Sequence, residues 1–317
     1  MEVLYIVVPC YNEQEVLPET TKRLLEKLNT LIAKEKISAD SRILYVDDGS
    51  KDKTWELIAK AHAEDVHVAG LKLSRNRGHQ NALLAGLMTA KSLCDICISM
   101  DADLQDDIEA IDAMLEKHRQ GCDIVYGVRS SRKKDTFFKR NSALAFYRFM
   151  KALGVEMVDN HAEYRLMSRR ALEGLASFPE VNLFLRGIVP LIGFPSGTVE
   201  YERGERFAGE TKYPLKKMLG FAFDGITSFS VKPIRFVFSM GILLFLVSIA
   251  VLIYSLVVKL LGHTVTGWTT VMISIWMIGG IQLLCLGVIG EYIGKIYQEV
   301  KHRPAYIIEA FLNDPVE

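Results

Sequence analysis

The sequence predicts an α/β fold with a mostly parallel central sheet, followed by membrane-associated helices. Two observations lead to this prediction. Short β-branched runs alternate with helical periodicity through residues 3–128, and two long uncharged apolar runs lie near the C-terminus. Alternating strands and helices form right-handed crossovers, which give a parallel sheet covered on both faces. The 38 basic and 38 acidic residues cancel, and a neutral chain argues against nucleic acid as a partner.

The expected elements follow from hydrophobic period and from turn residues. The strands are expected over residues 3–8, 43–46, 67–73, 96–100 and 124–128, the first ending at Pro9. The helices are expected over residues 13–36, 54–63, 80–91 and 108–119, the first capped by Asn12. Ligands bind beyond the carboxyl ends of parallel strands. Polar clusters follow three of these ends, at residues 9–13, 47–50 and 101–105.

The apolar runs 236–258 and 271–290 are each long enough to cross a bilayer, because roughly 20 helical residues span about 30 Å. Basic residues flank their outer ends, which favours a hairpin with both ends in the cytoplasm. The N-terminus shows no signal-peptide pattern, so the first domain is expected to be cytosolic too. The segment 213–230 mixes apolar and basic residues, which favours interfacial amphipathic helices over helices packed on the domain.

These observations predict four regions in the chain. They are a cytosolic domain over residues 1–212, interfacial helices over 213–232, a transmembrane hairpin over 233–298 and a cytosolic tail over 299–317.

An acidic cluster follows the fourth expected strand. Residues i and i+2 of an extended segment point to the same side, so the side chains of Asp101, Asp103 and Gln105 are expected to converge. Such oxygen ligands suit Mg²⁺ or Mn²⁺, which would neutralise a leaving diphosphate. The alternative for acidic residues here is the start of a helix, and Asp106 and Asp107 are expected to serve that purpose.

A basic run follows the fifth expected strand, from Arg129 to Arg140. It is either a solvated face or a loop that closes over phosphates. Five cysteines form no disulfide framework. Cys94 and Cys97 match C-x-x-C, but a second ligand pair is missing, so reduced thiols in a strand are expected rather than a zinc site.

Five motifs occur in an order typical of one enzyme family. They are Pro9-Cys10-Tyr11-Asn12-Glu13, Val46-Asp47-Asp48-Gly49-Ser50, the stretch from Ser74 to Gly86, Asp101-Ala102-Asp103-Leu104-Gln105, and Arg165-Leu166-Met167-Ser168. Together they resemble the family 2 glycosyltransferases of the GT-A fold. More narrowly, nearly the whole chain is similar to the polyprenyl-phosphate glycosyltransferases, which include dolichyl-phosphate mannose synthases and bacterial undecaprenyl-phosphate glucosyl- and N-acetylglucosaminyltransferases.

The resemblance implies a role for each matching residue. The nucleoside would be bound by Pro9, Tyr11, Glu13, Val46 and Asp48, with Asp48 at the base. The diphosphate and its cation would be met by Asp101, Ala102, Asp103 and Gln105. The lipid phosphate would be met by Arg129, Arg132, Arg203 and Arg206, since arginine offers phosphate a bidentate fork. Lys212 matches the family's Gly-x-Ser-Lys segment, with Thr211 in place of serine, and is expected at the nucleotide.

The chain departs from the family at Ala162-Glu163-Tyr164-Arg165, where many relatives have Gly-Asp-Phe-Arg. The expected catalytic residues are Asp101, Asp103, Arg129 and Glu163. A phosphate monoester is already an ionised nucleophile near neutral pH, so we expect Glu163 to orient a substrate rather than to remove a proton.

The implied reaction is the inverting transfer of one sugar from a nucleotide-diphosphate sugar to polyprenyl (undecaprenyl) phosphate, at the bacterial cytoplasmic membrane. UDP is the expected nucleotide. Both glucose and N-acetylglucosamine stay open, and by resemblance the segment Asn160-His161-Ala162-Glu163-Tyr164 favours N-acetylglucosamine.

Three other functions fit the sequence less well. A processive polysaccharide synthase usually carries a Q-x-x-R-W segment and more spans, which are absent from the sequence. A non-catalytic nucleotide-sugar-binding subunit would not need every metal and phosphate position. A flippase needs more than two spans to form a polar path, although a separate flippase partner is compatible with the sequence. Glycines within residues 279–294 could also pack helices within the hairpin or in a homo-oligomer.

Overall fold

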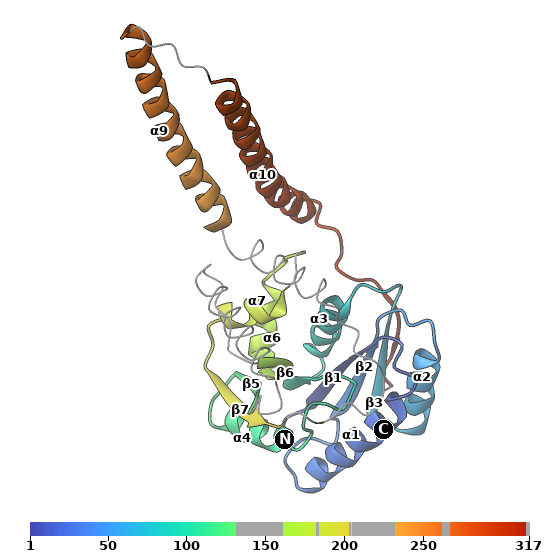
Figure 1. Ribbon diagram of the computed structural model, residues 1–317. Coiled ribbons are helices and arrows are strands. Elements are labelled where there is room, and N and C mark those ends of the chain that lie inside the picture. Colours follow the sequence, from blue (N-terminus) through green and yellow to red (C-terminus); the bar gives the residue numbers. More distant parts are fainter. Residues whose placement is uncertain (131–160, 182–183, 203, 205–231, 262–266, 315–317) are drawn as a thin grey trace. The chain divides into compact units, whose positions relative to one another are not determined.

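The computed structural model describes residues 1–130, 161–181, 184–202, 204, 232–261 and 267–314 of the chain (Figure 1). The chain divides into two compact units. The first comprises Met1–Tyr147, Glu156–Pro214 and Arg303–Glu317, and the second comprises Arg148–Val155 and Leu215–His302.

An eight-stranded sheet in the order β7-β5-β6-β4-β1-β2-β3-β8 forms the centre of the first unit. Its strands are β1 Leu4–Cys10, β2 Arg42–Asp47, β3 Val68–Leu73, β4 Ile96–Ser99, β5 Ile124–Arg129, β6 His161–Ser168, β7 Ser196–Tyr201 and β8 Ile308–Leu312. The strands β1 to β4 run parallel, and β7 runs parallel to β5. Both β4 and β5 pair antiparallel with β6, so they share one direction, and only β6 and β8 oppose it among the described strands. The mostly parallel α/β sheet is confirmed.

The described helices of this unit are α1 Leu17–Ala33, α2 Thr54–Glu64, α3 His79–Ala90, α4 Ala110–Arg119, α6 Arg169–Ala176 and α7 Leu185–Leu191. Every helix expected before residue 120 is present. The helices α1, α2 and α4 pack with the strands in one hydrophobic core, whereas α3 packs against Val7 of β1 and Val46 of β2. The expected capping role of Asn12 is wrong. The helix α1 begins later, after Val16, and Asn12 lies in the left-handed region with φ 54°. Its side chain accepts a hydrogen bond from the Lys51 backbone instead.

Three strands were not predicted from the sequence. The strands β6 and β7 follow residue 160, and β6 is inserted between β4 and β5. The third, β8, lies within the expected C-terminal tail and pairs with the edge strand β3. Arg42 donates to Asn313 Oδ1 at 2.7 Å, and Lys72 pairs with Glu309 at 2.7 Å. The tail therefore completes the sheet and covers an edge that would otherwise present unpaired backbone groups.

The second unit contains two long helices, α9 Lys232–Leu260 and α10 Trp268–Val300, which contact each other. The expected spans 236–258 and 271–290 lie within them. In the described part of the chain, one stretch, Met277–Val300, is long and apolar enough to cross a membrane, and none of it is buried. A transmembrane hairpin of two spans therefore stays a prediction, and the segment 213–230 lies outside the described residues.

The glycines of α10 do not serve as close packing points among the described residues. A Cβ atom added at any of the five would meet nothing within 4 Å: Gly279, Gly280, Gly287, Gly290 and Gly294. By contrast, a Cβ at Gly86 of α3 would lie 2.4 Å from Val7 Cγ1 and 2.7 Å from Val46 Cγ2. The helix α3 thus packs tightly on β1 and β2.

We expect Gly86→Ala to lower the free energy of unfolding by about 1–3 kcal/mol, because the added methyl group overpacks the interface between α3 and the sheet. Thermal unfolding of the purified protein measures this effect. Gly287→Ala is the matched control, since it adds the same methyl group to a helix where nothing lies within 4 Å. Equal melting temperatures for the two variants would show that α3 does not pack as described.

Candidate active site

The loops that follow β1, β2 and β3 are joined by hydrogen bonds that backbone N–H groups donate to short polar side chains. The Asn12 N–H donates to Ser50 Oγ at 3.0 Å, and the Lys51 N–H donates to Asn12 Oδ1 at 2.9 Å. Asp48 is buried and accepts from the Arg77 N–H at 2.6 Å and from the Gly78 N–H at 2.9 Å. Three loops at one edge of the sheet therefore form a connected structure.

Gly49 is required at the centre of these loops for two reasons. Its φ of 66° lies in the left-handed region, and an added Cβ would lie 2.6 Å from the Arg75 carbonyl carbon. The loop after β3 thus rests directly on the Gly49 backbone. Burial raises the pKa of Asp48 above its ordinary value, and the amides of Arg77 and Gly78 oppose that shift. Asp48, the residue expected at the base, therefore holds the loop after β3 in place.

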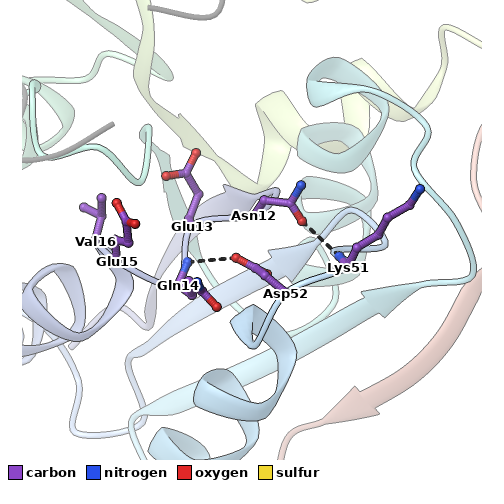
Figure 2. A pocket seen from close by; sticks show the side chains of 7 residues that line it. All are labelled: Asn12, Glu13, Gln14, Glu15, Val16, Lys51 and Asp52. Carbon is purple, nitrogen blue, oxygen red and sulfur yellow. Dashed lines mark hydrogen bonds between the residues drawn. The ribbon is translucent and has the colours of Figure 1, made fainter. Parts of the chain in front are cut away.

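A pocket of about 430 Å³ lies between the loops after β1 and β2 (Figure 2). Its lining residues are Asn12, Glu13, Gln14, Glu15, Val16, Lys51 and Asp52. Glu13 is the one residue of the expected nucleoside set in that lining. Pro9 and Val46 are buried within strands, and Tyr11 is half-buried. The residues expected to bind the nucleoside therefore lie at one edge of the sheet, but they do not line a single pocket.

The acidic segment 101–105 after β4 forms a turn (the acidic turn) rather than an extended strand. Residues 102 and 103 lie in a turn, and Leu104 has a φ of 57°. The Gln105 N–H donates to Asp103 Oδ1 at 3.2 Å. The expectation of an extended segment is wrong here, because β4 ends at Ser99 and the chain reverses two residues later. Gln105 lines a second pocket of about 650 Å³, whose lining includes neither Asp101 nor Asp103.

Asp106 and Asp107 have different roles, although both were expected to serve the helix start. Asp107 accepts from the Glu109 N–H at 2.9 Å, as a residue before a helix does. Asp106 is buried and accepts from the Tyr201 hydroxyl. Arg129 lies beside this pair, with Nε 3.4 Å from the Tyr201 hydroxyl oxygen and Nη2 3.9 Å from Asp106 Oδ1. Burial, and next the charge of Asp101, raise the pKa of Asp106 to about 6.

Glu163 lies at the same edge because β6 runs against its neighbours. Ile96 pairs with Ser168, and Ser99 pairs with Arg165. Glu163 lies two residues beyond this last pair, near enough to His79 for the histidine charge to lower the pKa of Glu163. Ser99 Oγ also donates to the Glu163 carbonyl oxygen at 2.6 Å. Inserting β6 therefore brings a carboxylate from a distant part of the chain next to the acidic turn.

The carboxylate of Glu163 is buried between two guanidinium groups. One oxygen pairs with Arg165, and the other accepts from Arg186 Nε at 2.7 Å. Burial alone would raise the pKa of Glu163, but Arg165 and Arg186 overcome it and lower that pKa to about 2. A carboxylate with so low a pKa is a poor proton acceptor. The Glu163 carboxylate is therefore suited to remain negatively charged rather than to accept a proton.

Two further residues at this edge were missed by sequence reasoning. His79 begins α3, and its Nε2 lies 3.6 Å from Asp101 Oδ1. Arg186 is the second residue of α7. In the sequence, Arg186 is marked only by being the single charged residue of the apolar run Leu185–Leu191. Among the expected binding residues, Arg132, Arg203 and Arg206, assigned to the lipid phosphate, and Lys212, assigned to the nucleotide, lie outside the described residues.

Two family models match the sequence. Residues 5–175, more than half of the chain, match the model described as Glycosyl transferase family 2. The chain belongs to glycosyl transferase family 2. Residues 232–296 of this glycosyltransferase match the model described as GtrB C-terminal hairpin.

Individual relatives align with this glycosyltransferase from end to end. An uncharacterized glycosyltransferase of Bacillus subtilis (strain 168), YkoT, is 59% identical and aligns over 97% of this chain and 91% of its own. A bactoprenol glucosyl transferase of Shigella phage SfV is 39% identical, over 96% of this chain and 97% of its own. Glucosyl-3-phosphoglycerate synthase from Mycobacterium tuberculosis, in complex with phosphoglyceric acid, shares 16% identity and a TM-score of 0.50. That match covers 72% of this chain and 79% of the synthase, and it shows a shared fold.

The buried charge of Glu163 predicts a specific pH dependence of stability. The pKa of Glu163 falls from an ordinary value of 4.5 to about 2 in the folded protein, so the charge stabilises the fold fully above about pH 4.5. This contribution is lost as the pH falls towards 2. We expect the melting temperature of the parent to exceed that of Glu163→Gln most at pH 7, and the difference to shrink on acidification.

Melting temperatures measured from pH 7 to pH 3 test this prediction. The exposed Glu173 of α6 provides the control, because Glu173→Gln removes one glutamate outside the site. We expect this control to follow the parent at each pH. A constant difference between the parent and Glu163→Gln at all pH values would contradict the described charge pair.

Proposed function

We propose that this glycosyltransferase transfers one glucosyl residue from UDP-glucose to a polyprenyl phosphate. The observation that carries the proposal is the grouping of acidic and basic side chains at the edge of the sheet where the acidic turn lies. Asp101 there is 3.6 Å from His79, and Asp106 is bordered by Arg129. Carboxylates that can bind a cation, next to arginines that can bind phosphate, suit a nucleotide diphosphate.

The comparisons support the acceptor and the sugar. The bactoprenol glucosyl transferase relative aligns over 96% of this chain, a length that takes in both family matches. Its name supports a polyprenyl carrier as the acceptor. It also supports glucose, rather than the N-acetylglucosamine that the segment 160–164 favoured by resemblance. UDP remains the nucleotide implied by the family resemblance.

The donor set of the acidic turn fits Mg²⁺ or Mn²⁺. Asp101 and Asp103 offer hard oxygen ligands, and the Asp101 side chain is 36% exposed, so a cation can reach it. In the described part of the chain, no three His, Cys, Asp or Glu side chains gather into a metal site. The ion would therefore take further ligands from water and from substrate phosphates, with Gln105 as the proposed amide ligand. When bound, it would neutralise the leaving diphosphate.

The chain's own residues would contribute position and charge rather than proton transfer. Polyprenyl phosphate needs no general base, and Glu163 stays ionised between Arg165 and Arg186. We therefore assign Glu163 to the orientation of the site. Direct in-line displacement would invert the anomeric carbon, with catalysis supplied by alignment and by charge neutralisation. Arg129 is proposed to meet phosphate at the start of the basic run.

The membrane arrangement is part of the proposal. The match to the GtrB C-terminal hairpin supports α9 and α10 as two spans. Exposed apolar side chains on both helices, such as Phe236, Phe238 and Leu283, are consistent with a lipid environment. The catalytic domain and both termini would then be cytoplasmic. Two spans form no polar path, so a separate flippase would carry the product across the bilayer.

A transfer assay tests the proposed reaction. The purified full-length protein is mixed with undecaprenyl phosphate, Mn²⁺ or Mg²⁺ and each labelled nucleotide sugar, and label is counted in the organic phase. We expect label from UDP-glucose, abolished by EDTA. We expect Asp103→Ala to lower the rate at least about a hundredfold, because charge neutralisation is lost at the diphosphate. Asp40→Ala, an exposed aspartate before β2, is the control and should keep the parental rate.

Two outcomes would contradict the proposal. Label from another nucleotide sugar alone would overturn glucose as the sugar. Absence of label from every donor, in a folded protein that binds UDP, would overturn the transferase function and favour a binding subunit.

A further inference from the structure

Arg186 connects a buried carboxylate to the surface of the candidate site. Its Nε atom donates to Glu163 Oε1 at 2.7 Å. The Glu163 side chain is 7% exposed, whereas the Arg186 side chain is 39% exposed. A guanidinium group has a rigid planar shape, so a bond at Nε fixes the direction of the whole group. Glu163 therefore orients Arg186 while leaving part of its side chain accessible to a ligand.

Two guanidinium groups, those of Arg165 and Arg186, face the carboxylate of Glu163. Arg165 is only 1% exposed and cannot reach a ligand in solution. Of these two guanidinium groups, that of Arg186 is therefore the one that a ligand can reach. An anion bound there would gain a charge-assisted hydrogen bond from a group that is already oriented.

The backbone beside Arg186 is held by the same elements that face the acidic turn. The Leu185 N–H donates to Gln80 Oε1 at 3.0 Å, and Arg165 Nη1 lies 3.5 Å from the Leu185 carbonyl oxygen. Gln80 directly follows His79, whose ring lies 3.6 Å from Asp101. Two separate ties, one from α3 and one from β6, thus place Arg186 at the edge of the sheet where Asp101 lies.

We infer that Arg186 binds a phosphate oxygen of a substrate, and that Glu163 holds its guanidinium group in position for this contact. The inference rests on the proposed function, in which two substrates carry phosphate. The ligand is either the diphosphate of the nucleotide sugar or the phosphate of the polyprenyl acceptor. Both present the anionic oxygens that an oriented guanidinium group recognises.

Binding measurements on the full-length protein test this assignment without requiring turnover. Calorimetry gives the dissociation constant of UDP in the presence of Mn²⁺, and of farnesyl phosphate as a short soluble acceptor. We expect Arg186→Gln to weaken one of the two by about ten- to a hundredfold, as expected for a lost hydrogen bond between charged groups. Weakening of UDP assigns the contact to the donor, and weakening of farnesyl phosphate assigns it to the acceptor.

Arg186→Lys keeps a positive charge beside Glu163 but loses the planar fork, so it should fold and weaken the same ligand less. If Arg186→Gln does not fold, the dissociation constants of Arg186→Lys test the inference instead. Arg170→Gln is the matched control, because Arg170 is an exposed arginine of α6 that pairs with Asp123 at 3.5 Å, outside the site. It should leave both dissociation constants unchanged.

Unchanged affinity for both ligands in folded Arg186→Gln or Arg186→Lys protein would overturn the inference and leave Arg186 as a structural partner of Glu163. The transfer assay on the parent reports separately on the proposed function. A parent without transfer, whose phosphate binding still depends on Arg186, would overturn the reaction and support the phosphate contact.

Discussion

The candidate site depends on one buried ion pair, between Glu163 and Arg165 on β6. Two charged side chains two residues apart are almost fully removed from water, and each would be costly there without the other. Glu163 satisfies its second oxygen with Arg186, and Arg165 approaches the Leu185 carbonyl oxygen. Satisfying this pair therefore requires α7 to dock at one place on β6. The antiparallel direction of β6 then determines which edge of the sheet receives the cluster.

The other half of the site is built by the loops after the parallel strands. Asp48 holds the loop of Arg77 and Gly78, and Gly49 allows that loop to approach its backbone. The helix α3 begins immediately after this loop, with His79 facing Asp101. The loops and the charge cluster thus meet at the start of α3. In the proposed function, the loops would bind the nucleoside, and the charge cluster around Glu163 would bind phosphate.

Much of this fold could be predicted from the sequence, because its first strands are continuous apolar runs followed by polar clusters. The acidic turn, Asp48 and Glu163 were identified from motifs. The strand β6 could not be predicted from its pattern, since the charged Glu163 and Arg165 interrupt its apolar run and are buried only through their pairing. Arg186 was missed for the same reason, as its role depends on a contact between residues 23 positions apart. The turn at Asp103 was missed because the alternation of a strand was extended beyond its last paired residue.

A double-mutant cycle of Glu163→Gln and Arg186→Gln would test the central claim most directly, namely that Glu163 acts on substrate phosphate through Arg186. The dissociation constant of the phosphate ligand is measured for the parent, both single variants and the double variant, with thermal unfolding to confirm that each is folded. We predict that the double variant binds about as weakly as Arg186→Gln alone, giving a coupling of about 0.5–3 kcal/mol. Effects that add to within about 0.5 kcal/mol would show that the two residues act independently and would contradict this account.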